Sequence, residues 1–160
     1  MKKVFLLFTI LAAWTSIAES QTYGKLGAGL MVGEPSGISW KYRFDHANAL
    51  GGAVGFLPDA GVRVDIDYLW HTHPFSNELF GVDWGAGIAV GPGRSDFSAS
   101  RTGYFERGEE IGFGVRGVAE LNYLIQHSPV DLFLDAAPLL ILTPDSKTGL
   151  DTGFGMRVYF

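Results

Sequence analysis

The sequence is dominated by segments in which apolar residues alternate with polar residues or glycine. In residues 62–70 every second position is apolar, and Arg63, Asp65 and Asp67 stand between apolar neighbours. Successive side chains of a β-strand point to opposite faces, so such a segment forms a strand with one apolar face and one polar face. The pattern recurs in eight segments, which cover residues 23–32, 37–44, 49–57, 62–70, 80–90, 111–122, 130–142 and 151–160.

Eight alternating segments joined by turn-forming residues predict an all-β chain that folds as an eight-stranded antiparallel up-and-down transmembrane β-barrel. A soluble barrel shares this alternation. A transmembrane barrel turns its apolar side chains toward lipid, whereas a lipocalin-type barrel turns them inward around a ligand. The polar faces carry many glycines and charges of both signs, while a soluble exterior would carry denser charge. This composition favours the transmembrane barrel.

The positions of the aromatic residues also favour a transmembrane barrel once a topology is assumed. With both termini in the periplasm, Trp40, Trp70, Trp84 and Phe160 all fall toward one rim of the barrel. Such a belt is expected where a barrel crosses the membrane–water interface. The longest connection, residues 91–108, then lies on the outer side. We therefore expect a location in the bacterial outer membrane, with a soluble periplasmic carrier of an apolar ligand as the alternative.

The N-terminus has the composition of an export signal. Two lysines precede an apolar run over residues 4–13, and Ala18-Glu19-Ser20 offers small residues at the cleavage-recognition positions. This predicts a cleavable signal peptide over residues 1–20 and one barrel domain over residues 21–160. The apolar run is too short for a membrane-spanning helix. The chain has no cysteine, so we expect no disulfide framework.

The overall charge limits the possible partners. The full chain has a formal net charge of −5, and removal of the signal takes away two lysines and one glutamate. A nucleic-acid partner is therefore not expected, because phosphate binding needs a concentrated positive patch.

Charged side chains on the polar faces are expected to fill the bore. An eight-stranded barrel is only just wide enough for side chains to fill its interior. Opposite charges should therefore form salt bridges there and block continuous water, rather than line an open pore. Arg63 is expected to pair with Asp65 or Asp67, and Arg116 with Glu120. The predicted network comprises Lys25, Lys41, Arg43, Arg63, Asp65, Asp67, Asp83, Arg116, Glu120, Asp131, Asp135, Asp151 and Arg157.

The four histidines are candidates for metal ligands and catalytic groups. His71 and His73 are two residues apart, so in an extended segment they would share a face and could share a metal ion. The surrounding residues have the composition of a turn, however, and Asp67 is the nearest further ligand in the sequence. His46, His127 and Ser128 also map to periplasmic turns, away from the external leaflet where lipid A deacylases act. The sequence therefore predicts no metal, no cofactor and no enzymatic activity.

Residues 91–108 form the best candidate for a recognition surface. Arginine and aromatic residues are enriched at interaction sites, and arginine pairs well with the phosphates of lipopolysaccharide. A functionally neutral hairpin is the alternative. The candidate contact residues are Arg94, Phe97, Arg101, Tyr104, Phe105 and Arg107.

Several motifs carry a resemblance to known barrels. The signal, the eight amphipathic segments and the terminal Arg157-Val158-Tyr159-Phe160 resemble the small outer-membrane barrels typified by OmpX and the OmpA transmembrane domain. Residues 29–37 resemble the opening hairpin of a family of uncharacterised bacterial barrels also found in spirochaetes, and residues 67–71 and Ala137-Pro138 extend that similarity.

The resemblance implies a transient partner. In such barrels the outer-membrane assembly machinery reads the C-terminal aromatic strand, which corresponds here to Phe154, Met156, Val158 and Phe160. No catalytic residue set carries over. We expect a monomer in contact with outer-membrane lipid and lipopolysaccharide, with a role in envelope integrity, adhesion or ligand contact. A lipid-modifying outer-membrane enzyme is a third possibility.

Overall fold

The computed structural model describes residues 24–57, 61–75, 79–93, 110–143 and 146–160. The predicted signal peptide lies outside the described residues. So do all six candidate contact residues between Arg94 and Arg107.

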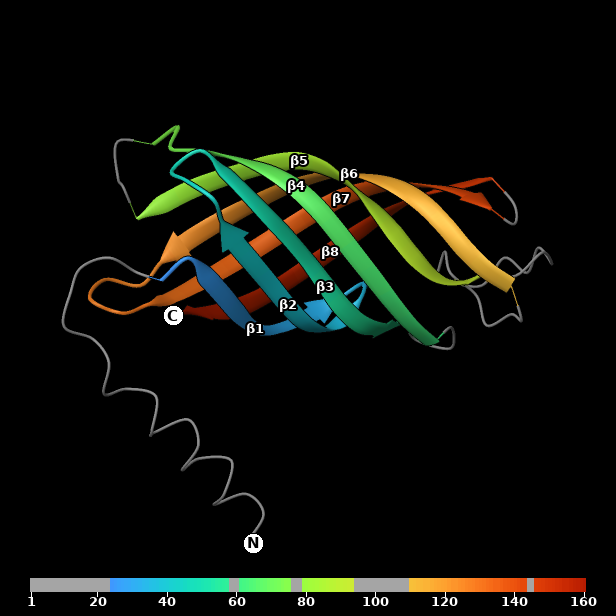
Figure 1. Ribbon diagram of the computed structural model, residues 1–160, viewed down its shortest axis with the longest axis horizontal. Coiled ribbons are helices and arrows are strands. Elements are labelled where there is room, and N and C mark those ends of the chain that lie inside the picture. The colour runs from blue at the N-terminus through green and yellow to red at the C-terminus, as the bar shows by residue number, and fades with distance from the viewer. Residues whose placement is uncertain (1–23, 58–60, 76–78, 94–109, 144–145) are drawn as a thin grey trace, which may run out of the picture.

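Eight antiparallel strands form one closed barrel, which confirms the predicted all-β, eight-stranded antiparallel fold. Each strand pairs with its sequence neighbour, and β1 closes the barrel by pairing with β8. Figure 1 shows the strands tilted against the barrel axis, with the C-terminus and the start of β1 at the same end. The strands are β1 (Leu26–Gly33), β2 (Ser36–Arg43), β3 (Asn48–Leu57), β4 (Gly61–Thr72), β5 (Phe80–Gly93), β6 (Glu110–Leu124), β7 (Val130–Thr143) and β8 (Lys147–Tyr159). No helix in the described part of the chain is long and apolar enough to cross a membrane.

Several strands extend further than the alternation predicted. The ladder between β5 and β6 continues through the pairs Gly91–Gly112 and Gly93–Glu110, so the loop expected over residues 91–108 begins only after Gly93. Strand β4 continues to Thr72, two residues beyond its predicted end, because His71 and Thr72 pair with β5. In both places the residues have the composition of a turn, but the neighbouring strand forms hydrogen bonds with their backbone N–H and C=O groups.

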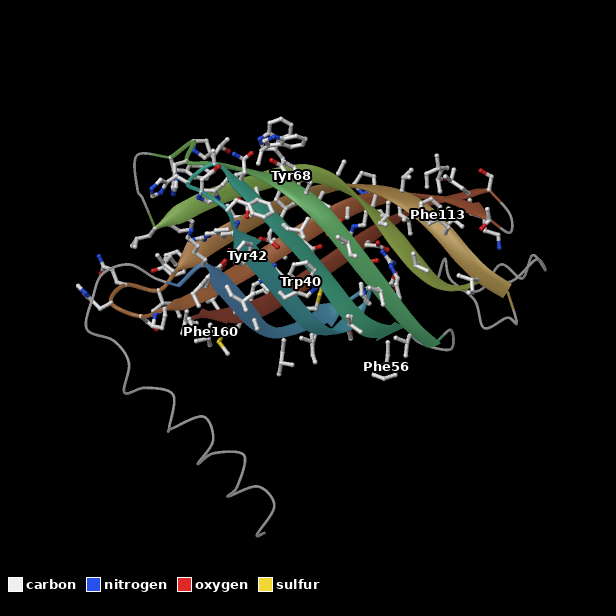
Figure 2. All side chains as sticks on the ribbon, in the orientation of Figure 1. Trp40, Tyr42, Phe56, Tyr68, Phe113 and Phe160 are labelled. Carbon is white, nitrogen blue, oxygen red and sulfur yellow. The ribbon has the colours of Figure 1, made fainter. Side chains whose placement is uncertain are left out.

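The apolar faces of the strands form the outer wall. Along β4 the side chains alternate between exposed and buried: Ile66, Tyr68 and Trp70 are exposed, whereas Asp65 and Asp67 are buried. Figure 2 shows Phe56 and Phe160 standing off the outside of the barrel. The charged faces consequently meet inside.

Aromatic rings form a chain of contacts on the outer wall near the end that holds the termini. The series runs from Tyr42 and Phe44 to Tyr68, Trp70 and Trp84. Ring centroids are 5.1 Å apart for Tyr68 and Trp70 and 4.8 Å apart for Trp70 and Trp84. We call these five residues the aromatic ladder. It joins β4 and β5 to Tyr42 of β2 and to Phe44, which directly follows β2.

The interior also contains apolar side chains. One cluster joins Met31, Ala53 and Phe133, and a second joins Ala49, Leu69, Val118 and Ala137. Phe133 needs the small residue opposite it on β8, because a Cβ added at Gly155 would lie 2.4 Å from its Cζ atom. Small residues therefore leave room for large interior neighbours.

The turn between β2 and β3 is closed by Asp45. Its Oδ1 atom accepts hydrogen bonds from the backbone N–H groups of Ala47, at 2.7 Å, and Asn48, at 2.8 Å. The side chain of Asn48 also donates to Asp45. These donors, the Ala47 N–H first, hold the pKa of the Asp45 carboxyl below its usual range.

Replacing Asp45 with asparagine should lower the barrel's stability at neutral pH but not in acid. The folded-state pKa lies below the unfolded-state value, so ionised Asp45 contributes stability above about pH 4, and this contribution is lost as the pH falls through the folded-state pKa. Urea denaturation midpoints of the wild type and Asp45→Asn should therefore converge as the pH is lowered. A difference that stays constant with pH would contradict this role.

Candidate functional site

The polar strand faces bring most of the predicted network into the bore. Among the described residues, four cations and seven carboxylates are buried there. The cations are Lys41, Arg63, Arg116 and Arg157; the carboxylates are Asp65, Asp67, Asp83, Glu120, Asp131, Asp135 and Asp151. The interior of this part of the chain therefore holds more acidic than basic groups.

Arg116 lies at the centre of one ionic cluster. Its Nη1 atom donates to Asp65 Oδ2 at 2.6 Å, and its Nη2 atom lies 3.4 Å from Asp135 Oδ2. The same guanidinium lies 3.3 Å from Asp67 and 3.7 Å from Asp151. We call Arg116 and these four carboxylates the Arg116 cluster.

Arg63 joins the Arg116 cluster from β4. Its Nε atom donates to Asp65 Oδ1 at 2.7 Å, and its Nη2 atom donates to Asp151 on β8. Asp65 and Asp151 thus each contact both arginines, and Asp67 and Asp135 contact Arg116.

A second ionic cluster lies closer to the end that holds the termini. Lys41 Nζ contacts Asp83 and Glu120 and donates to Asn122 Oδ1 at 3.0 Å. Arg157 makes two hydrogen bonds to the Glu120 carboxylate, with Nη1 to Oε1 at 2.9 Å. We call Lys41, Asp83, Glu120, Asn122 and Arg157 the Lys41 cluster. It connects β2, β5, β6 and β8 across the bore.

Two aromatic rings hold the arginines near this end. The guanidinium of Arg157 lies 3.6 Å from the centroid of the Phe133 ring. The Tyr159 hydroxyl donates to Asp131 Oδ2 at 3.1 Å, and Arg43 stacks over the Tyr159 ring at 4.5 Å. Cation–π contacts of this kind orient a guanidinium while leaving its N–H groups available for carboxylates.

Three predicted details of the network differ in the structure. Lys25 is exposed, because it precedes β1 at the end of the barrel, and Arg43 is only half-buried. Arg63 pairs with Asp65, as expected, but Arg116 pairs across strands rather than with Glu120. Arg116 and Glu120 share a face of β6 but lie four residues apart, a separation of about 13 Å along a strand.

The centre of the bore is almost filled. A cavity of about 20 Å³ lies between the two ionic clusters, lined by Asp67, Leu69, Arg116 and Phe133 among others. A space of this size holds about one water molecule. Asp67 Oδ1 and Asp135 Oδ1 lack a hydrogen-bond partner among the described residues.

A larger cavity, of about 360 Å³, opens at the end that holds the termini. Its lining includes Lys41, His46, His71, His73, Asp83 and Asp131. We call it the mouth cavity. His71 Nδ1 contacts Asp83 Oδ1, and His71 Nε2 lies 3.2 Å from His73 Nε2.

The contact between His71 and Asp83 was missed in the sequence. The two residues lie directly opposite each other in the register of β4 and β5. Both stand on the polar face of their segments, so this pairing follows once β4 is extended past Trp70. Among the described residues, no group of three or more His, Cys, Asp or Glu side chains is arranged to hold a metal ion.

The predicted assembly signal lies on the outer face of β8 and at the C-terminus. Phe154, Met156 and Phe160 are exposed, and Val158 is partly exposed. Recognition of these side chains by an assembly machinery stays a prediction.

Comparison with known proteins adds no family assignment. No protein-family model, no curated protein and no solved structure matches this chain. The closed barrel is consistent with the small barrel predicted from the sequence, and its membership of a particular barrel family stays a prediction.

Proposed function

We propose that the protein is a small outer-membrane β-barrel with a charge-filled bore and a structural or surface-contact role. The observation that supports this proposal is the distribution of side chains across the barrel wall. Large apolar side chains such as Phe56 and Ile111 are 68% and 75% exposed, while eleven charged groups are buried behind them. An apolar surface this extensive needs a partner, and lipid tails cover it on all sides.

The aromatic ladder supports the same proposal. Tyrosine and tryptophan gather at the height of lipid headgroups, because their rings are apolar and carry one polar atom. The ladder residues lie near the end of β2, the end of β4 and the start of β5, which are the strand ends beside the termini. In a bacterial outer membrane this end faces the periplasm.

The filled interior favours an outer-membrane barrel over a carrier of an apolar ligand. A carrier needs an apolar cavity large enough for its ligand. The central space of about 20 Å³ is lined by charged groups as well as apolar ones. The same packing makes a solute channel a poor candidate function, so the bore acts as a stabilising plug.

The surface-contact part of the proposal rests on the loop between β5 and β6. Strand β5 ends and strand β6 begins at the end of the barrel opposite the termini (Figure 1). In this topology the six contact residues predicted from the sequence would face the cell exterior. Their role stays a prediction.

A charge placed on the outer wall tests the membrane location. Ile66 lies on the apolar face of β4 and is 42% exposed. Ile66→Arg should cost about 2–4 kcal/mol if lipid surrounds this position and should be nearly neutral if water does. The matched control is Thr72→Arg at the end of the same strand, where an added charge should be tolerated.

The measurement uses cells that express the full-length chain with its export signal. Wild type and Thr72→Arg should appear in the detergent-extracted outer-membrane fraction and change gel mobility on heating. Ile66→Arg should lose the heat-modifiable form. Release of the wild type by osmotic shock, with Ile66→Arg behaving like it, would disprove the membrane location.

A further inference from the structure

We propose that the mouth cavity contains a binding site for a divalent transition-metal ion, held by the Nε2 atoms of His71 and His73. Imidazole nitrogen is a ligand suited to Zn²⁺, Cu²⁺ and Ni²⁺. The site depends on the barrel fold alone, so it does not rest on the proposed membrane location.

The distance between the two nitrogens fits a shared metal ion. Two imidazole nitrogens bound to Zn²⁺ at about 2.0–2.1 Å, with a tetrahedral angle between them, are separated by about 3.3 Å. The Nε2 atoms of His71 and His73 lie 3.2 Å apart. The ring centroids are 4.4 Å apart and the ring planes are at 88°, so the exposed His73 ring must turn before both lone pairs point at one metal ion.

The backbone explains why the two rings meet. His71 lies within β4 and Thr72 is its last residue, so the chain is still extended where it enters His73. Residues two apart in an extended segment point to the same side. The sequence offers this arrangement, but the turn composition of the segment argued against an extended backbone there.

Asp83 fixes the orientation and the tautomer of His71. The Nδ1–H group of His71 donates to Asp83 Oδ1, which leaves the lone pair of Nε2 directed toward His73. Metal-binding histidines commonly donate their second nitrogen to a carboxylate in this way. His71 is thus oriented as a ligand before any metal arrives.

Asp83 is itself held by the Lys41 cluster. Its Oδ2 atom accepts from Lys41 Nζ and, at 2.9 Å, from the side-chain amide of Asn122. The carboxylate has 1% exposure. The positions of both its oxygen atoms are therefore determined by the fold.

The mouth cavity can accommodate the rest of the coordination shell. Its volume of about 360 Å³ leaves room for several water molecules beside the two imidazoles. Asp131 also lines this cavity, and its Oδ1 atom has no hydrogen-bond partner among the described residues. Two protein ligands leave coordination positions open for water or for a small anionic molecule.

Metal binding must also account for the proton that lies between the two imidazole rings. The hydrogen bond between the two Nε2 atoms contains one proton, which the metal ion replaces. A neutral His73 carries that proton on Nδ1 instead, and a cationic His73 releases it to solvent, so His73 is neutral in both cases once the metal is bound. No oxidant or further reactant is needed.

Titration of the refolded full-length chain in detergent micelles with zinc chloride tests the site. The wild type should bind one Zn²⁺ per barrel by calorimetry. His71→Ala and His73→Ala should each weaken this binding at least about tenfold. The matched control is His127→Asn, which removes a histidine from another turn at the same end of the barrel.

Copper provides a readout that a purely structural role would not change. The electron paramagnetic resonance spectrum of bound Cu²⁺ should show coupling to two imidazole nitrogens in the wild type and to one in His73→Ala. Asp83→Asn tests the positioning residue: it should keep both couplings but weaken zinc binding about 10- to 100-fold. Heat-modifiable gel migration verifies that each variant is folded.

Two results would disprove the site. One is the absence of Zn²⁺ binding by the folded wild type at millimolar metal. The other is equal binding by wild type, His71→Ala and His73→Ala, which would place the ion elsewhere. His73 is exposed, so His73→Ala should fold even if His71→Ala does not.

Discussion

Replacing Arg116 with methionine should lower the free energy of unfolding by about 3–5 kcal/mol, or prevent the barrel from closing. The guanidinium lies within salt-bridge distance of Asp65, Asp67, Asp135 and Asp151. Methionine would fill much of the same space but leave these buried carboxylates without their shared cation. The loss should be measured by urea unfolding in phospholipid vesicles, with tryptophan fluorescence as the signal.

A triple variant separates loss of charge from loss of packing. Arg116 contacts both Asp67 and Asp135, so Arg116→Met combined with Asp67→Asn and Asp135→Asn should recover much of the lost stability. Removing both partners of a buried ion pair costs less than removing one. If the triple variant is less stable than Arg116→Met alone, the charge explanation is wrong.

Arg43 is the matched control for Arg116. It is half-buried at the mouth and stacks on Tyr159 rather than contacting several carboxylates. Arg43→Met should cost only about 0.5–1 kcal/mol, the usual range for an accessible cation–π contact. A similar loss for both arginines would show that side-chain volume matters more than charge pairing.

Replacing Gly29 with alanine should be the most damaging small substitution in the barrel wall. A Cβ at this position would lie 1.7 Å from the carbonyl oxygen of Met156 and 2.7 Å from Cα of Arg157. Both atoms belong to the backbone of β8, so relief requires movement of the strand rather than of a side chain. We expect a loss of about 3 kcal/mol, at the upper end of the usual range for overpacking.

Gly117→Ala is the control, because it adds the same methyl group to another strand. The nearest atom to a Cβ at Gly117 is Cγ of Pro138 at 3.5 Å, which is ordinary contact. Its stability should stay within about 0.5 kcal/mol of the wild type. Comparable urea midpoints for the two alanine variants would contradict the close approach of β1 and β8.

The period of the sequence was enough to predict the strands and their faces. Each side chain of an alternating segment points either into the bore or outward. The charged face of β4 identifies the interior face, and the charged faces of the neighbouring strands follow from it. Strand ends were harder to predict. Gly91 and Gly93 resemble turn residues in isolation, and only their pairing with β6 shows that they continue a strand.

The partners inside the bore could not be derived from periodicity. Alternation says that Arg116 points inward, but its height and its direction across the bore depend on the register of every strand between it and its partner. Arg63 and Asp65 were predictable because they are neighbours on one face of one strand. The contact between His71 and Asp83 needed one hairpin register, which the turn composition of residues 71–77 concealed.

Many ionic contacts in the bore join strands that are not neighbours. Arg63 on β4 reaches Asp151 on β8, and Lys41 on β2 reaches Asp83 on β5. A hairpin inserted alone cannot make these contacts, and neither can a sheet that lacks its last strand. We therefore expect the charges to stay hydrated until the seam between β1 and β8 forms, so that closure of the ring and expulsion of water occur as one all-or-none step.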